Sequence, residues 1–295
     1  MVSTMILMPL LLVSCRSEPR SSVGGLRILA STSFLADIAQ NVAGAGGKVE
    51  SLLPVGADPH AYQAAPADVA KITESTVLIL NGIEYEKFIE PLLENAGGEP
   101  LIIFASDGLV PTSTQEDGTK IGDPHMWLDP HRVVKYVENI RDGLIEADPG
   151  GAKFYQVNAD AYILQLKALD AWISDQVQSV PPDHRLLVTN HEALGYFAER
   201  YGFSIVATVL PSVSTDAGTS AQELAAVIDQ VKASGAPAIF LGEVESPDLA
   251  NQIAAETGAK VVRDLYLESL TDGEPAGTYI DMMKYNVARI VDALK

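Results

Sequence analysis

Short apolar runs alternate with segments of helical periodicity from Leu26 onward, and this alternation limits what the chain can fold into. Strands that alternate with helices form βαβ units with a parallel sheet. The first series predicts strands at 27–30, 49–53, 77–80 and 101–104 and helices at 34–42, 66–74 and 88–95. The second series predicts strands at 186–188, 205–207, 238–241 and 260–262 and helices at 193–201, 220–233, 247–257 and 276–294. The fold class is therefore α/β, with two lobes that each hold a parallel sheet flanked by helices.

One long helix is expected between the two lobes. A first helix should run from Asp129-Pro130 to about residue 146, because Asp is a good N-cap and Pro suits the first turn. The long helix follows at about 152–179, and the polar stretch 110–122 is predicted to be a loop. We therefore expect an N-terminal lobe at 26–150, a connecting long helix at 151–182 and a C-terminal lobe at 183–295.

Composition excludes several classes of protein. The 295 residues are 47% hydrophobic, enough for a sizeable core and about two domains. The chain has 20 Lys and Arg residues against 39 Asp and Glu residues, a formal net charge of −19, so general nucleic-acid binding is not expected. The single cysteine, Cys15, excludes an intramolecular disulfide and a thiolate metal site in the body of the protein.

The first residues have the features of a secretory signal. Residues 5–13 are nine apolar residues, too few to span a bilayer, which takes ~20. The following Leu-Val-Ser-Cys, which ends at Cys15, resembles a bacterial lipobox, although no Lys or Arg precedes the apolar run. We therefore expect a lipoprotein signal peptide and tether at 1–25. A lipid on Cys15 would hold the protein outside the cytoplasmic membrane, as a membrane lipoprotein or in the periplasm.

Three of the five histidines lie at predicted strand-to-helix junctions: His60, His125 and His191. In open α/β sheets, ligands bind beyond the carboxyl ends of the strands. The spacings of 65 and 66 residues exclude a local zinc finger or an HExxH helix, so only the fold could bring these side chains together. Because the body of the protein after Cys15 contains no cysteine, a transition-metal site there must use His nitrogen and carboxylate oxygen. A shared metal site and three separate capping or surface imidazoles both remain open at this point.

Five blocks of sequence carry a more specific resemblance. They are PVGADPHAYQAAPADVAKI, LILNGIEYEKF, DPHMWLDPHRVVKYVENI, TNHEALGYFAERYGF and LYLESLTDGEPAGTYIDMMKYN. In this order, from about Leu26 to Ala293, the chain resembles the zinc/manganese solute-binding proteins of bacterial ABC importers. The resemblance implies that the long connecting helix restrains the opening of the lobes.

The resemblance also implies a ligand set. It assigns His60, His125, His191 and Glu268 as metal ligands, with Glu268 at a position where the family usually has Asp. A solvated loop acid is the alternative for Glu268. Metal-bound histidines commonly donate their other N–H to a carboxylate. Candidates for such supporting groups are Asp58, Asp123 and Glu243.

Three imidazoles and one carboxylate suit Zn(II), which accepts tetrahedral His and carboxylate ligands. Mn(II) lies below zinc in the affinity order and favours more carboxylate, so zinc is predicted, and manganese or another divalent metal is the alternative. His131 and His184 are expected not to be ligands: His131 lies just inside a helix and His184 in an exposed linker. The stretch 112–121 contains no histidine, which argues against a metal-collecting loop there.

The predicted function is capture of Zn(II) between the lobes and delivery to the permease and ATPase of an importer. The protein is expected to be a monomer. It is not expected to be an enzyme, because four protein ligands leave no open coordination position. A metallohydrolase, which needs an open position and a general base, is a weaker alternative, as is a surface adhesin. Protonation of the histidines should weaken metal binding near and below pH ~6.

Overall fold

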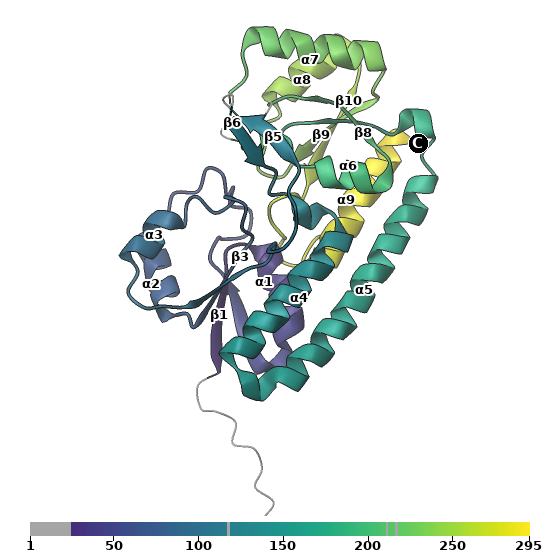
Figure 1. Ribbon diagram of the computed structural model, residues 1–295. Helices are drawn as coiled ribbons and strands as arrows, with labels where there is room; N and C mark the ends of the chain where they lie inside the picture. Colours follow the sequence, from purple (N-terminus) through teal and green to yellow (C-terminus); the bar gives the residue numbers. More distant parts are fainter. Residues whose placement is uncertain (1–24, 117–118, 211, 216–217) are drawn as a thin grey trace, which may run out of the picture.

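The computed structural model describes residues 25–116, 119–210, 212–215 and 218–295, and it contains two parallel four-stranded sheets. The N-terminal sheet has the order β2-β1-β3-β4, with β1 (Leu26–Ala30), β2 (Gly47–Ser51), β3 (Val77–Leu80) and β4 (Leu101–Phe104). The C-terminal sheet has the order β10-β9-β7-β8, with β7 (Leu186–Thr189), β8 (Ser204–Thr208), β9 (Ala238–Gly242) and β10 (Lys260–Leu265). The α/β prediction is confirmed, and Figure 1 shows the two sheets in separate lobes.

Several helices begin at a residue whose side chain accepts a backbone N–H of the first turn. The N-terminal lobe contains α1 (Ser33–Ala43), α2 (Pro66–Glu74), α3 (Glu90–Asn95) and α4 (Pro130–Ala147). The C-terminal lobe contains α6 (Gly195–Tyr201), α7 (Ala221–Ser234), α8 (Asp248–Thr257) and α9 (Tyr279–Leu294). The Asp129 side chain caps α4, as predicted, by accepting from the backbone N–H of His131, and Ser220 with Glu223 forms a capping box on α7. Single 3-10 turns lie at Gly44–Gly46, Met126–Leu128, Pro149–Gly151 and Pro182–His184.

The long helix α5 (Ala152–Gln178) joins the lobes and is packed along its length. It contacts α1 and α4 of the N-terminal lobe and α9 of the C-terminal lobe (Figure 1). Its inward face buries Tyr155, Ala159, Tyr162, Leu166, Leu169, Ile173 and Val177. One hydrophobic core therefore continues from one lobe into the other, so the connection is a packed helix and not a free linker.

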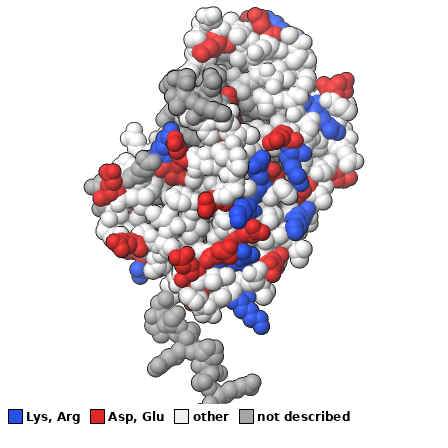
Figure 2. All heavy atoms as spheres, viewed as in Figure 1, with Lys and Arg blue, Asp and Glu red and all other residues white. Residues whose placement is uncertain are grey.

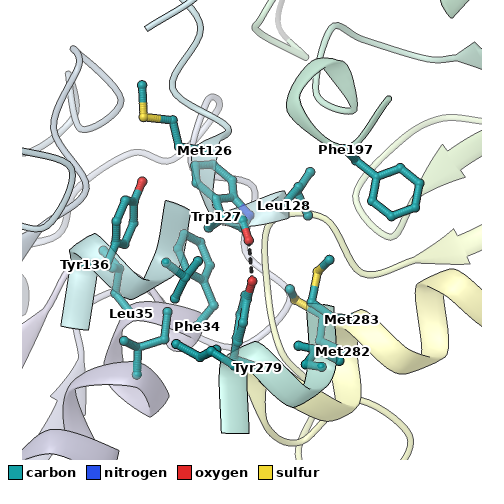
Figure 3. Close-up of a cluster of buried hydrophobic side chains, with 14 of the residues drawn as sticks. Phe34, Leu35, Met126, Trp127, Leu128, Tyr136, Phe197, Tyr279, Met282 and Met283 are labelled. Carbon is teal, nitrogen blue, oxygen red and sulfur yellow. Dashed lines mark hydrogen bonds between the residues drawn. The ribbon is translucent and has the colours of Figure 1, made fainter. Parts of the chain in front are cut away.

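A buried aromatic cluster lies in this shared core. Trp127 is fully buried and stacks on Phe34 with a centroid separation of 4.5 Å. The hydroxyl of Tyr279, in α9, donates to the Trp127 carbonyl oxygen at 2.7 Å (Figure 3). The Trp127 indole N–H donates to the Leu267 carbonyl oxygen at 2.8 Å. These contacts hold the segments that contain His125 and Glu268 against one rigid centre.

One predicted loop proved to be a hairpin. Residues 110–122 contain the antiparallel strands β5 (Ser113–Glu116) and β6 (Thr119–Gly122), with Ser113 opposite Gly122. The sequence prediction was wrong here because the two strands read STQE and TKIG, with Ile121 as their one apolar residue, so no apolar alternation marks them. Polar residues in such a ribbon cannot be told from a loop.

The surface and the chain start add two observations. On the face shown in Figure 2, acidic and basic side chains are interspersed and no broad basic patch is visible. Within the described ranges, none of the helices combines the length and apolar character needed to cross a membrane. Cys15, the predicted lipidation site, lies outside the described residues.

Candidate metal centre

The fold brings the four predicted ligands together. His60 lies in the loop after β2, His191 directly after β7, and Glu268 in the loop after β10, so three of them follow the carboxyl end of a strand. His125 lies between the β5–β6 hairpin and α4. One candidate ligand atom from each of these residues lies within 4.8 Å of all the others.

The distances between these atoms suit a small cation. Glu268 Oε1 lies 3.3 Å from Nε2 of both His125 and His191 and 3.8 Å from Nε2 of His60. The Nε2 atoms of His125 and His191 are also 3.3 Å apart. Four ligands at ~2.0–2.1 Å from a tetrahedral ion would be separated from one another by roughly 3.3–3.4 Å.

Two of the converging atoms are buried without a hydrogen bond. His60 Nε2 and Glu268 Oε1 have no hydrogen-bond partner among the residues that the structure describes. Leaving a buried polar atom unpaired costs about 1–3 kcal/mol. A cation at the centre of the cluster would contact both atoms and remove this cost.

In the N-terminal lobe, each histidine is held by the aspartate two residues before it. Asp123 Oδ1 accepts the backbone N–H of His125 at 2.9 Å and contacts the His125 ring at Nδ1 at 2.8 Å, which directs Nε2 to the centre. Asp58 Oδ1 accepts the backbone N–H of His60 at 2.9 Å, and Asp58 Oδ2 accepts the hydroxyl of Thr215 at 2.6 Å. Asp123 therefore contacts both the backbone and the imidazole of His125, whereas Asp58 contacts the backbone of His60 and not its ring.

In the C-terminal lobe, two glutamates after β9 support the ligands. Glu245 Oε1 contacts Nδ1 of His191, and Glu245 Oε2 accepts the backbone N–H of Gly242. Glu243 accepts the backbone N–H groups of three consecutive residues, Leu267, Glu268 and Ser269, at 2.8, 3.1 and 2.7 Å. Glu243, a predicted supporting acid, thus holds the backbone of Glu268, and the acid that contacts a histidine is Glu245. Glu245 was not among the predicted supporting residues, although its place just after a predicted strand was a usable signal.

The sequence matches known proteins over nearly all its length. Residues 28–293 match the family described as "ZnuA: Zinc-uptake complex component A periplasmic". The chain belongs to this family of metal ABC transporter substrate-binding proteins.

The relatives of this ZnuA-family protein differ in the metal that they are named for. It is 35% identical to the manganese-binding lipoprotein MntA of Halalkalibacterium halodurans over 271 residues, 92% of this chain and 89% of MntA. It is 32% identical to the iron-binding protein YfeA of Yersinia pestis over 276 residues, 93% of this chain and 88% of YfeA.

Solved structures show the same fold. The Mn-bound periplasmic metal-binding protein of Candidatus Liberibacter asiaticus superposes with a TM-score of 0.81 at 31% identity, over 91% of this chain and 99% of that one. The periplasmic zinc-binding protein TroA of Treponema pallidum superposes with a TM-score of 0.84 at 26% identity, over 92% and 99% of the two chains.

The charges at the centre of this ZnuA-family protein are strongly coupled. Burial lowers the pKa of His191, but its contacts with Glu245 and Glu268 outweigh burial and raise the pKa to about 10. Burial likewise opposes protonation of His125, yet Asp123 and Glu268 raise its pKa above 6.5. Burial raises the pKa of Glu268, but the imidazoles around it hold that pKa well below 4.5. His191 therefore keeps a proton at neutral pH, which a bound metal ion would have to displace.

The two remaining histidines lie apart from the cluster. The backbone N–H of His131 donates to Asp129 Oδ1 in the first turn of α4. The Nδ1 atom of His184 lies 3.1 Å from the carbonyl oxygen of Leu294. Neither residue belongs to the four-residue group.

Proposed function

We propose that this protein binds Zn(II) between its lobes and delivers the ion to the permease and ATPase of an importer. The observation that carries the proposal is the convergence of three imidazole nitrogens and one carboxylate oxygen, all within 4.8 Å of one another. In this proposal His60, His125, His191 and Glu268 are the ligands, and Asp58, Asp123, Glu243 and Glu245 position them.

Zinc is favoured by the donor set. Nitrogen-rich sites of low coordination number suit Zn(II), whereas Mn(II) favours oxygen ligands and octahedral geometry. Manganese is the second candidate, because MntA is named as manganese-binding and the Liberibacter protein was solved with Mn bound.

The same geometry supports transport and not catalysis. Four protein ligands around a tetrahedral ion leave no position for the water that a metallohydrolase activates. We propose a monomer in which lobes 26–150 and 183–295, joined by the helix at 151–182, enclose the ion. The lipobox-like sequence at Cys15 and the lipoprotein names of relatives support a lipid anchor outside the cytoplasmic membrane.

Release is proposed to occur through small shifts of loops or lobes at the contacts between the two lobes, and not through a wide opening. The Ser269 hydroxyl accepts the backbone N–H of Gly56 at 2.8 Å, and the Leu270 N–H donates to the Ser33 hydroxyl at 2.9 Å. These contacts join the C-terminal loop to the N-terminal lobe. Because α5 packs on both lobes, breaking these few bonds should cost less than separating the whole interface.

Metal analysis of the protein purified without added metal, followed by competition between Zn(II) and Mn(II), tests the proposal. The expected result is one bound ion per chain and preference for zinc at equal concentrations. Preference for manganese would transfer the function to the second candidate, and failure to bind either ion would exclude both.

A further inference from the structure

The two oxygens of the Glu268 carboxylate have different surroundings. Oε1 faces the three imidazole Nε2 atoms at 3.3, 3.3 and 3.8 Å. Oε2 accepts the hydroxyl of Tyr85 at 2.7 Å. Both side chains are buried, with Tyr85 4% and Glu268 2% exposed, so water does not compete for this bond.

The backbone of Glu268 is fixed independently of Tyr85. The Glu243 carboxylate binds the N–H groups of Leu267, Glu268 and Ser269, and the Trp127 indole binds the Leu267 carbonyl. With the main chain held on both sides, the direction of the Glu268 carboxylate depends on the partners of its two oxygens.

Tyr85 itself is held by a constrained turn. Its ring lies 4.9 Å from that of Trp127 and meets the His60 ring edge to face at 5.7 Å. The two residues before it, Ile83 and Glu84, have φ angles of 56° and 57°, which are uncommon for residues other than glycine. The following residue, Glu86, is buried and accepts the Gly82 N–H at 3.0 Å and the Ser31 hydroxyl at 2.8 Å. This turn keeps the Tyr85 hydroxyl directed at Glu268.

We propose that Tyr85 is a positioning residue that makes Glu268 a one-oxygen ligand and thereby favours a four-coordinate ion over one that takes more oxygens. A carboxylate that chelates an ion must turn both oxygens toward it, and the bond to Tyr85 directs Oε2 away from the imidazoles. Mn(II) gains more than Zn(II) from an added oxygen. The inference rests on the proposed function, because it concerns how the same site discriminates between zinc and manganese.

The test compares Tyr85→Phe with Tyr62→Phe. Each variant loses one hydroxyl, but the Tyr62 hydroxyl donates to Asp68 Oδ2 at 2.8 Å and not to Glu268. Dissociation constants for Zn(II) and Mn(II) are measured by chelator competition at one pH. We expect the preference for zinc over manganese to fall about tenfold in Tyr85→Phe, within the range found for residues that support metal ligands, and to stay unchanged in Tyr62→Phe. Equal weakening of both metals, or an unchanged preference, would overturn the proposal.

X-ray absorption spectroscopy of the zinc-loaded proteins gives a second measurement. The wild type should show four nitrogen and oxygen ligands, and Tyr85→Phe should show one more oxygen. Two Glu268 oxygens on zinc in the wild type would overturn the proposal even if the variant failed to fold. If the wild type prefers manganese, the proposed function fails, but the change from wild type to Tyr85→Phe still decides the role of Tyr85.

Discussion

The two lobes hold their candidate ligands in different ways. In the N-terminal lobe, each histidine is the last residue of an Asp-Pro-His sequence, and the aspartate accepts the backbone N–H two residues later. In the C-terminal lobe, Glu245 contacts His191 across 54 residues of sequence, and Glu243 contacts the Glu268 N–H across 25. The first arrangement is local and the second depends on the tertiary fold.

Sheet order explains the second arrangement. Strand β9 lies between β10 and β7, so the turn after β9 lies between the loop with Glu268 and the segment with His191. Glu243 reaches one side of this turn and Glu245 the other. One short segment therefore positions both ligands of its lobe, whereas the N-terminal lobe needs a separate aspartate for each histidine.

Removal of a ligand from either lobe should have the largest effect. The binding free energy of a four-ligand zinc site is ~10–16 kcal/mol. If it is shared equally, each ligand accounts for roughly 3 kcal/mol, or about 100-fold in affinity. His60→Ala and His191→Ala should each weaken Zn(II) binding by about this factor, measured by chelator competition. His184→Ala is the control and should bind as the wild type does. A loss in His184→Ala equal to that in His60→Ala would show that the ligand set is wrong.

The effect of pH on zinc affinity should be nearly as large as the effect of removing a ligand. His191 has a pKa raised to about 10, so in the metal-free protein it keeps a proton that zinc must displace throughout the neutral range. Each displaced proton weakens binding about tenfold per unit fall in pH, so affinity should drop about 100-fold from pH 8 to pH 6. This places the onset above the pH ~6 expected from an ordinary histidine. Calorimetry in buffers of different ionisation enthalpy measures the proton release, and an affinity that is flat over this range would contradict the coupling.

In the protein without metal, the raised pKa of His191 should make the stability of the fold depend on pH in a defined direction. A raised histidine pKa stabilises the folded state fully below the ordinary pKa near 6.5, and this stabilisation is lost as pH rises through about 10. Thermal unfolding of the chelator-treated protein between pH 7 and pH 10 measures it. A melting temperature that rises over this interval would contradict the assignment.

Loss of Glu245, which supports His191 from a distant part of the sequence, should lower zinc affinity more than loss of Asp123, which supports His125 locally. Each Glu245 oxygen has its own donor, and Gln offers one acceptor, so Glu245→Gln must lose either the His191 or the Gly242 contact. A loss of about 10–100-fold in zinc affinity is expected. In Asp123→Asn, a single amide oxygen can still accept from both the backbone and the ring of His125, so a smaller loss is expected. A larger loss of affinity in Asp123→Asn than in Glu245→Gln would contradict this difference between the lobes.

The smallest effect is expected at Asp58. Asp58→Asn keeps an oxygen for the His60 N–H, and its amide can donate to the Thr215 hydroxyl. Zinc affinity should change by less than about threefold, well under the 10–100-fold typical of groups that orient a ligand ring. A larger loss would mean that Asp58 influences the imidazole as well as the backbone.

The sequence by itself determined the α/β class, most of the helices and strands, and the family resemblance that selected His60, His125, His191 and Glu268. The fold class and the elements follow from local periodicity and caps, which can be read along the chain, and the ligand set follows from the resemblance carried by the five sequence blocks. The local partner of His125 could be predicted for the same reason, since Asp123 lies only two residues away.

Only the tertiary structure decided the distances and the distant partners. The β5–β6 hairpin has no apolar alternation along its strands to mark it, and nothing near His191 in sequence indicates Glu245. The pairing of Tyr85 with Glu268 joins residues 183 positions apart. Such contacts depend on sheet order and on the packing of loops between the lobes, and hydrophobic periodicity specifies which face of an element is buried but not which loop lies opposite it.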